Sequence, residues 1–329
     1  MALTFRAVNP LDHREQLKRL FLAGGVATYP AFIDRAYPPA VAAGAASWIG
    51  ETDGRLVMHM ARFNHRFVHG ESVLTGGLLV NLMVDNAHRE FFPAVSLART
   101  AVAESRRDGG IDFLYTNPNA GGLAIVRAAG LNIVSGLRRF ILPLGPGVTP
   151  RDLAARAYRR FRKTVTSVPS VGLKRWAAKE FDVGMVEKPH RSEFVTAIHP
   201  ADWYRMWLPG YPAVDADFWF THQQGATLLA ALFVRIEDRV AKLLTFRRRP
   251  GIRLGSLLWS IADQVAALGA RHLQIWTLTE SPLSIELREA GFFPRRDIQP
   301  FLILPLTPAG AAAARALPKW EITDFDCDR

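Results

Sequence analysis

The sequence predicts an α+β protein built from two copies of one unit. The chain has 329 residues, which is more than one average core needs and suits two domains of about 150 residues. Hydrophobic residues make up 49% of the chain and charged residues 22%, so there is enough apolar material for two buried cores. Helix-like and strand-like segments alternate along both halves, and an internal repeat relates the halves to each other.

The repeat joins four successive elements. The strand-like segment Ile111–Tyr115 corresponds to His272–Trp276, and both are preceded by a helix-like stretch. A Gly-hydrophobic pair follows each strand fifteen residues later, and a further strand comes after it: Arg139–Leu144 in the first half and Phe301–Leu306 in the second. We expect each of these last strands to complete its own unit. An offset of about 161 residues relates all four elements, which indicates a duplication.

Periodicity assigns the elements of the first half in chain order. A strand at Thr4–Val8 precedes a helix that Asp12 caps. Asp53-Gly54 is a strong hairpin signal between two apolar segments. Leu78–Val84 is almost entirely apolar, which predicts a central strand buried on both faces. A helix that ends at Gly109-Gly110 and a helix over Ala120–Ala129 flank the strand Ile111–Tyr115.

The second half repeats this order. Strands at Phe218–Thr221 and Thr227–Ile236 flank a turn at Gln224-Gly225, and Val240–Phe246 is the central strand. An apolar helical stripe follows and ends at Gly269. Ser281-Pro282 is a helix start, because a proline at the first helical position loses no hydrogen bond.

This order of elements resembles the GNAT (Gcn5-related N-acyltransferase) fold over residues 1–145 and 190–307. The most specific segment is Leu82-Met-Val-Asp-Asn-Ala-His-Arg89, which runs into Phe92-Pro-Ala94 and a helix. In the family, a turn of pattern Arg/Gln-x-x-Gly-x-Gly/Ala ends the central strand, and its backbone amides bind the CoA pyrophosphate. The resemblance implies two tandem GNAT folds. Each has a mixed, mostly antiparallel sheet with a splayed central strand pair and flanking helices.

The resemblance also sets the expected domain boundaries. An N-terminal GNAT-like domain covers residues 1–146, a basic helical linker 147–189, a C-terminal GNAT-like domain 190–307 and a tail 308–329. Paired GNAT folds of this kind resemble acyltransferases of bacterial polysaccharide or lipid pathways. They also resemble FemABX-like aminoacyl transferases, which use aminoacyl-tRNA.

Both phosphate-binding loops depart from the family pattern. Arg89 and Ala94 match its first and last positions, but Phe92 replaces the middle glycine and Pro93 has no amide donor. The second copy, Pro250–Gly255, keeps only the last glycine. The first half is nevertheless the expected ligand site, because the second copy offers the carboxylate of Glu280 where the first offers Asn119. The expected acyl-CoA-binding residues are Val84, Arg89, Ala94, Val95, Ser96, Asn117 and Asn119.

Few side chains are available for acid–base chemistry. Asp85 and His88 follow the central strand and are the candidate general bases, although each is also an ordinary turn residue. The tyrosine that many GNAT enzymes use as a general acid is replaced by Val126 and Leu287 in the two halves. The resemblance therefore implies that another group or water protonates the leaving thiolate. Asn117 has a local alternative role as a helix cap. His65 and His69 are interpreted as structural, and no metal site is expected.

The basic linker admits two interpretations. Leu153, Ala157 and Phe161 lie on one face of an expected helix that is rich in arginine. We expect this stripe to pack against the domains. The alternative is that the helix binds an anionic membrane surface or tRNA. A net charge of +11 is consistent with either partner and also with a generic basic surface.

Three classes of function remain open. The first is an acyl-CoA-dependent N-acyltransferase that acts on a small amine or amino-sugar. The second is a FemABX-like aminoacyl transferase, and the third is a catalytically silent GNAT pair that serves as a binding protein. The chain has one cysteine, Cys327, and begins without a secretion signal or a long apolar segment, so we expect a cytoplasmic protein.

Overall fold

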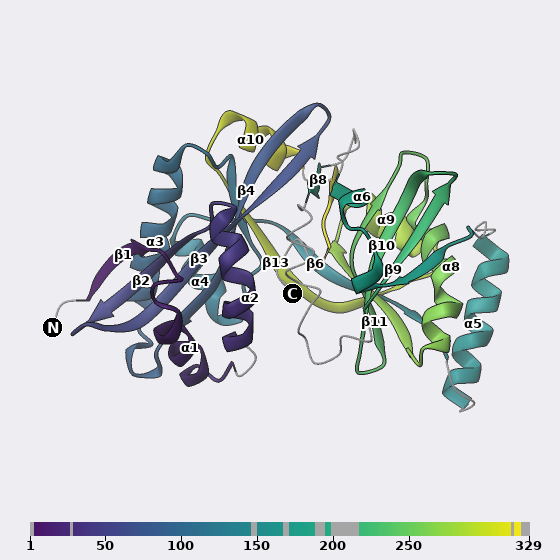
Figure 1. The fold of residues 1–329 in the computed structure, drawn as a ribbon, viewed down its shortest axis with the longest axis horizontal. Helices are drawn as coiled ribbons and strands as arrows, with labels where there is room; N and C mark the ends of the chain where they lie inside the picture. The colour runs from purple at the N-terminus through teal and green to yellow at the C-terminus, as the bar shows by residue number, and fades with distance from the viewer. Residues whose placement is uncertain are drawn as a thin grey trace. The chain divides into compact units, whose positions relative to one another are not determined.

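A computed structural model describes residues 3–26, 29–145, 150–166, 171–187, 195–198, 217–316 and 319–323. These residues form two compact units (Figure 1). The first unit contains the described residues up to Ser135 together with Gln299–Ala316. The second unit contains those from Gly136 to Ile298 and residues 319–323.

The first unit is built on a mixed sheet with the strand order β1-β2-β3-β4-β5-β13. Only β4 and β5 run parallel, and the other neighbours are antiparallel. The strands are β1 (Thr4–Val8), β2 (Ala46–Thr52), β3 (Arg55–His69), β4 (Ser72–Val84), β5 (Phe113–Thr116) and β13 (Phe293–Pro305).

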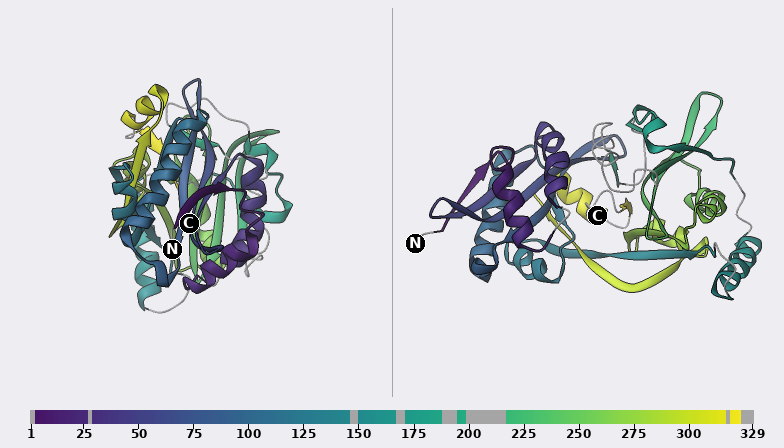
Figure 2. Two further views of the ribbon diagram at one scale, coloured as in Figure 1. Left: turned by 90° about the vertical axis from the view of Figure 1, so that its left-hand side faces the viewer. Right: turned by 60° about the horizontal axis from the view of Figure 1, so that its bottom comes forward.

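Helices cover both faces of this sheet, as the left view of Figure 2 shows. Alternate residues of β3 point to opposite faces. The ring of His59 packs against α1 (Arg14–Ala23) and α2 (Tyr29–Ala42). Arg62 reaches α3 (Phe91–Asp108), where its guanidinium donates to Ser105 and pairs with Asp108. The remaining helical segments of the unit are η1 (Asn86–His88), α4 (Ala120–Ala128) and α10 (Pro308–Arg315).

The second unit repeats the arrangement strand for strand, in the order β6-β12-β11-β10-β9-β7. Again one neighbouring pair is parallel, β11 with β12. The predicted duplication and the mixed, mostly antiparallel sheets are therefore confirmed. The strands are β6 (Asn132–Pro143), β7 (Lys174–Ala177), β9 (Asp217–Gln224), β10 (Thr227–Glu237), β11 (Val240–Arg248) and β12 (His272–Leu278). The other elements are α5 (Pro150–Thr166), η2 (Ala178–Glu180), α6 (Gly184–Glu187), α8 (Leu254–Ala267), α9 (Pro282–Glu289) and the short pair β8 (Val195–Ile198) and β14 (Trp320–Glu321).

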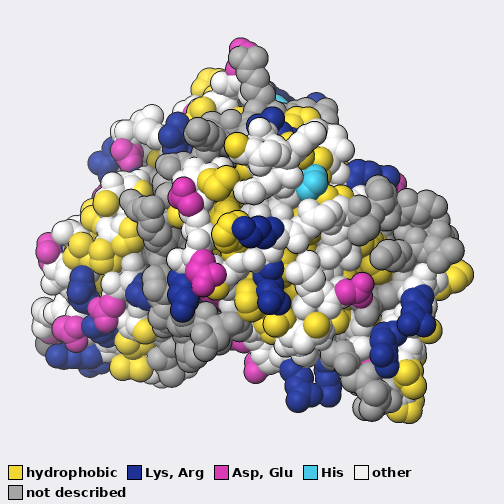
Figure 3. Space-filling model, turned by 45° about the vertical axis from the view of Figure 1, so that its right-hand side comes forward, with side chains coloured by type: hydrophobic (Ala, Val, Ile, Leu, Met, Phe, Trp, Pro, Cys, Tyr) yellow, Lys and Arg dark blue, Asp and Glu magenta, His cyan; other side chains and the backbone are white. Residues whose placement is uncertain are grey.

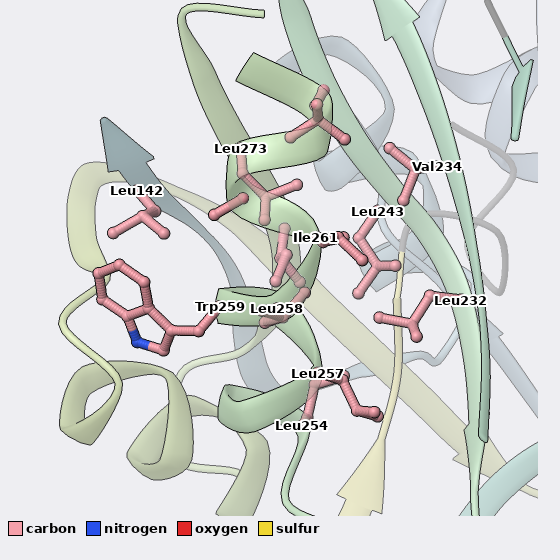
Figure 4. Close-up of a cluster of buried hydrophobic side chains, with 14 of the residues drawn as sticks. Leu142, Leu232, Val234, Leu243, Leu254, Leu257, Leu258, Trp259, Ile261 and Leu273 are labelled. Atoms are coloured by element: carbon pink, nitrogen blue, oxygen red, sulfur yellow. The ribbon is translucent and has the colours of Figure 1, made fainter. Parts of the chain in front are cut away.

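The strand that completes each sheet comes from the other half of the chain. Leu137–Pro143 of β6 pairs with β12, so it belongs to the sheet of the second unit. Leu302–Pro305 of β13 pairs with β5 in the first unit. The expectation that each closing strand would complete its own copy is therefore wrong. Figure 4 shows the consequence for the second core, where Leu142 of β6 lies in the same cluster as Leu258 and Leu273.

Local turn chemistry agrees with the sequence at Asp53-Gly54 and at Ser281. The expectation that Asp12 caps the first helix is wrong, because the N-cap residue of α1 is His13 and no side chain caps this helix. Asp53 and Gly54 both have positive φ values, 53° and 71°, as the two-residue hairpin turn between β2 and β3 requires. Ser281 caps α9 by accepting a hydrogen bond from the Ser284 amide at 3.2 Å, with Pro282 in the first turn. Within the described ranges, no helix has the length and apolar character to cross a membrane.

Candidate functional site

The two parallel strands of each unit part after a short contact. In the first unit, Gly76–Leu78 of β4 pairs with Phe113–Tyr115 of β5. Beyond this point β4 continues to Val84, whereas β5 ends at Thr116, whose hydroxyl donates to the Leu79 carbonyl at 2.8 Å. In the second unit, pairing of β11 with β12 likewise covers only Val240–Lys242. The predicted splay is therefore present in both units.

A bulge bends β4 where it leaves β5. The register of β3 and β4 shifts between His59 and Ala61, and Asn81 adopts a left-handed conformation with φ of 59°. Two buried side chains hold this residue. The Asn81 amide donates to the Tyr37 hydroxyl at 3.0 Å, and Nδ1 of His59 donates to the Asn81 carbonyl at 3.1 Å. Nδ1 of His59 therefore carries the proton, which leaves Nε2 as an acceptor for the Ser47 hydroxyl at 3.4 Å.

The pKa of His59 makes the first unit sensitive to acid. Burial lowers the pKa of this imidazole to about 4 from its ordinary value of 6.5, and the hydrogen bond to Asn81 opposes the shift only in part. The unfolded chain therefore binds more protons than the folded chain between these values. The contribution to stability is complete above pH 6.5 and is lost as the pH falls toward 4.

We therefore expect a fall in pH to lower the unfolding free energy of the wild type more than that of a His59→Gln variant. From pH 7 to pH 5, the wild type should lose about 2 kcal/mol of unfolding free energy that the variant keeps. Urea unfolding of both proteins at the two pH values measures this difference. Equal losses in both proteins would show that His59 does not titrate in this way.

The end of β4 is tied down by Asp85. One carboxylate oxygen pairs with Arg55 at 2.7 Å, and the other accepts from the Ala87 amide at 2.9 Å, which caps η1. The side chain is nearly buried, and these two partners give it a positioning role in the turn. His88, at the end of η1, is half-buried, and its imidazole has no hydrogen bond or ion pair with any residue that the structure describes. Of the two candidate bases, His88 is the one whose side chain remains available.

The N-terminus of α3 is open. Its first residue is Phe91, and no side chain caps the helix. The amides of Phe91 and Phe92 are therefore the first-turn donors, while Pro93 supplies none. Beside them the Arg89 guanidinium is exposed and forms no ion pair with the described residues. An anion placed at this turn would meet two amides, the positive end of the helix dipole and Arg89, with the exposed Glu90 carboxylate next to them in the chain.

The structure places the other expected cofactor residues less favourably. α3 begins earlier than expected, so Ala94, Val95 and Ser96 lie past its first three residues, where amides donate to carbonyls of the preceding turn. Val84 is the half-buried last residue of β4. The cap of α4 is Asn119, which accepts from the Gly122 amide at 2.9 Å. The alternative that Asn117 would cap this helix is therefore wrong. Asn117 is half-buried after β5.

The equivalent position in the second unit is filled by the protein itself. The Glu286 carboxylate accepts from the Gly255 amide, in the first turn of α8, at 3.1 Å. Its other oxygen pairs with Arg248 at 2.7 Å. Glu286 thus occupies the Gly255 amide and the Arg248 guanidinium, the two groups that a bound phosphate would otherwise contact. Glu280, which the sequence predicts to be the unfavourable carboxylate, is exposed. The carboxylate that bonds to the first turn of α8 belongs to Glu286.

Arg248 joins this carboxylate to a second one. It pairs with Glu321 of β14 at 2.5 Å and also donates to the Ile252 carbonyl at 3.0 Å. Burial by itself lowers the pKa of Arg248, but the charges of Glu321 and Glu286 outweigh it, so the pKa lies above its ordinary value. The guanidinium therefore stays positively charged, and both of its terminal nitrogens already bond to groups of the protein.

Comparisons with known proteins agree with this architecture. The sequence matches no protein-family model and no curated protein. Among solved structures, a GCN5-related N-acetyltransferase from Kribbella flavida is similar at 14% identity and a TM-score of 0.64, with 94% of this chain and 74% of that chain covered. Eis1 from Mycobacterium abscessus is similar at 12% identity and a TM-score of 0.61, with coverage of 95% and 76%. A tandem GNAT protein from the clavulanic acid biosynthesis pathway matches at 15% identity and a TM-score of 0.51, and the match covers 93% of this chain and 99% of that one.

The chain has the tandem GNAT fold.

Within this GNAT fold, the positions of the absent tyrosine are core positions. Val126 and Leu287 are both almost fully buried in the hydrophobic clusters of their units. Neither position can supply a proton to a leaving group. His65 bonds the Tyr115 hydroxyl through Nδ1 at 2.5 Å inside the first unit, in agreement with its structural interpretation. Among the described side chains, no cluster of His, Cys, Asp or Glu has the composition to hold a metal ion.

Proposed function

We propose that the chain is an acyl-CoA-dependent N-acyltransferase whose first unit holds the acyl donor. The observation that carries this proposal is the contrast between two equivalent helix ends. The first turn of α3 is uncapped beside the exposed Arg89. The first turn of α8 is bound to the Glu286 carboxylate. The solved acyltransferases with this fold give the class of reaction.

The chemistry follows from the residues at the end of β4. The nitrogen of a small amine or amino-sugar attacks the thioester carbonyl, the carbon–sulfur bond breaks, and CoA leaves as the thiolate. The amine must lose a proton, and the half-buried His88 is the available side chain for accepting it. Asp85 holds η1, and therefore His88, in place through its bonds to Arg55 and Ala87. Since Val126 occupies the position of the usual acid, the thiolate takes its proton from water.

A titration with CoA tests which unit binds the donor. We expect Arg89→Ala to weaken binding about tenfold, because one charge-assisted hydrogen bond to a phosphate is lost. Arg253→Ala is the matched control. This exposed arginine is the N-cap residue of α8, and its ion pair among the described residues is with Glu289 on the surface. Isothermal titration calorimetry of both variants should show a change in the first alone.

The outcome separates the remaining alternatives. Loss of binding in Arg253→Ala, with Arg89→Ala unaffected, would move the site to the second unit. An absence of any CoA binding by the parent protein would favour a catalytically silent GNAT pair or a FemABX-like aminoacyl transferase. Asn119→Ala is not a clean probe, because removal of this helix cap costs about 1 kcal/mol of stability regardless of ligand.

A further inference from the structure

The basic helix α5 turns its apolar stripe outward. Leu153 is 52% exposed and Phe161 is 63% exposed, and Ala157 between them is exposed as well. These residues lie four apart and therefore share one face of the helix. The expectation that this stripe would pack against the domains is wrong.

The opposite side of α5 anchors the helix. Tyr158 donates through its hydroxyl to the Gly291 carbonyl at 2.7 Å, and its ring lies 4.7 Å from that of Phe293. Asp152 is buried, and its backbone lies so close to Gly145 that a side chain at that glycine would collide with it. The orientation of α5 on the second unit is thus fixed by contacts that leave Leu153 and Phe161 on the outside.

The sequence of α5 is strongly basic. The α5 sequence contains six arginine and lysine residues and only one acidic residue, the buried Asp152. Among the side chains that the structure describes, Arg160 is exposed beside the apolar stripe. Phe293, which packs on Tyr158, is itself 46% exposed and precedes the exposed Arg295 and Arg296. Figure 3 shows dark-blue Lys and Arg side chains beside yellow hydrophobic ones at its lower right.

We propose that the outer face of α5 (Leu153, Ala157, Arg160 and Phe161) docks on an anionic lipid surface. An interfacial helix buries apolar side chains at the boundary of headgroups and acyl chains while its cationic residues meet anionic headgroups. Among the described side chains, the outer face of α5 presents Leu153 and Phe161 together with the cationic Arg160. A nucleic acid would use the arginines, but it offers no environment in which an exposed leucine is buried. This surface belongs to the second unit, whereas the proposed acyl-CoA site belongs to the first.

Vesicle binding by the full chain tests the proposal. We expect sedimentation with vesicles of phosphatidylglycerol and phosphatidylcholine, at least tenfold weaker binding to phosphatidylcholine alone, and weaker binding at high salt. The double variant Leu153→Gln/Phe161→Gln keeps every charge and should reduce binding to the mixed vesicles at least tenfold. The matched control is Leu268→Gln/Ile285→Gln. It removes two exposed apolar side chains of the same unit, 37% and 53% exposed, and should bind as the wild type does.

A parallel assay with bulk tRNA separates the two kinds of anionic partner. We expect the Leu153→Gln/Phe161→Gln variant to bind vesicles more weakly than the wild type does and to bind tRNA with the same affinity as the wild type. Circular dichroism and thermal unfolding confirm that both double variants are folded. Unchanged vesicle binding by this variant would overturn the proposal, and so would a wild type that binds tRNA but no vesicles. Equal losses in the two double variants would overturn it as well.

Discussion

Replacing Arg248 with alanine is expected to lower the free energy of unfolding by about 3 to 5 kcal/mol, because removal of one partner leaves buried charge without compensation. The guanidinium is the shared partner of Glu286 and Glu321. All three side chains are largely buried, with exposures of 12%, 13% and 5%. After the substitution, two carboxylates would face each other across a cavity that water reaches poorly.

The measurement is urea unfolding at pH 7, followed by circular dichroism and tryptophan fluorescence. Arg253→Ala is the control from the same loop, since its pair with Glu289 is exposed on both sides and should contribute at most about 1 kcal/mol. A further variant, Glu286→Gln, keeps an oxygen for the Gly255 amide and should cost less than Arg248→Ala. An Arg248→Ala variant that lost no more unfolding free energy than Arg253→Ala would show that Arg248 does not hold Glu286 in place. The Glu286 carboxylate could then leave the first turn of α8, and the second unit would regain a candidate anion site.

Local and periodic features of the fold could be predicted from the sequence. The duplication is visible because the spacing from the strand end to the Gly-hydrophobic pair is the same at Tyr115 and at Trp276. The turn at Asp53-Gly54 and the cap at Ser281 depend on backbone geometry within a few residues, and both agree with the structure. The sequence does not predict α2, because Pro38 and Pro39 lie inside it and proline interrupts the hydrogen bonding of a helix.

Features that depend on the choice between distant partners could not be predicted. Phe140-Ile-Leu-Pro-Leu144 and Phe301-Leu-Ile-Leu-Pro-Leu306 have nearly the same pattern, so nothing local decides which sheet each strand joins. The candidate site shows the same limit. Arg89 is proposed from the family motif and His88 from its place after the central strand. The bond from the Gly255 amide to Glu286 joins residues 31 apart and appears only in the folded unit.

Because each sheet is completed by a strand from the other half of the chain, we expect the isolated halves to be unstable. A fragment of residues 1–145 should fail to fold, because it lacks the strand that completes its sheet. Phe301, Leu302 and Ile303 are each at most 1% exposed in the first unit. At about 1.5 to 3 kcal/mol for each buried side chain, these three contribute roughly 5 to 9 kcal/mol. That is comparable to the whole stability of a typical domain, about 5 to 15 kcal/mol.

The segment after β13 adds polar contacts to the same unit. The Asp112 carbonyl accepts from the amides of Leu306 and Thr307, and its carboxylate accepts from the Thr307 hydroxyl at 2.8 Å. The other carboxylate oxygen accepts from the Thr75 amide at 2.8 Å, so this aspartate ties the returning chain to β4. A fragment without residues 299–316 would leave the Asp112 carbonyl, one Asp112 carboxylate oxygen and the apolar edge of β5 exposed to water.

Residues 1–135 joined to residues 299–316 by a Gly/Ser linker should therefore fold, whereas residues 1–145 should not. Circular dichroism, thermal unfolding and the dispersion of amide resonances distinguish a folded fragment from a collapsed one. The shorter fragment is a stringent control, because it carries its own closing sequence, Phe140-Ile-Leu-Pro-Leu144. Cooperative unfolding of residues 1–145 at the same temperature as the joined fragment would show that β6 can close the first sheet. The exchange of strands would then be one of two accessible pairings, and the first unit could act without the second half of the chain.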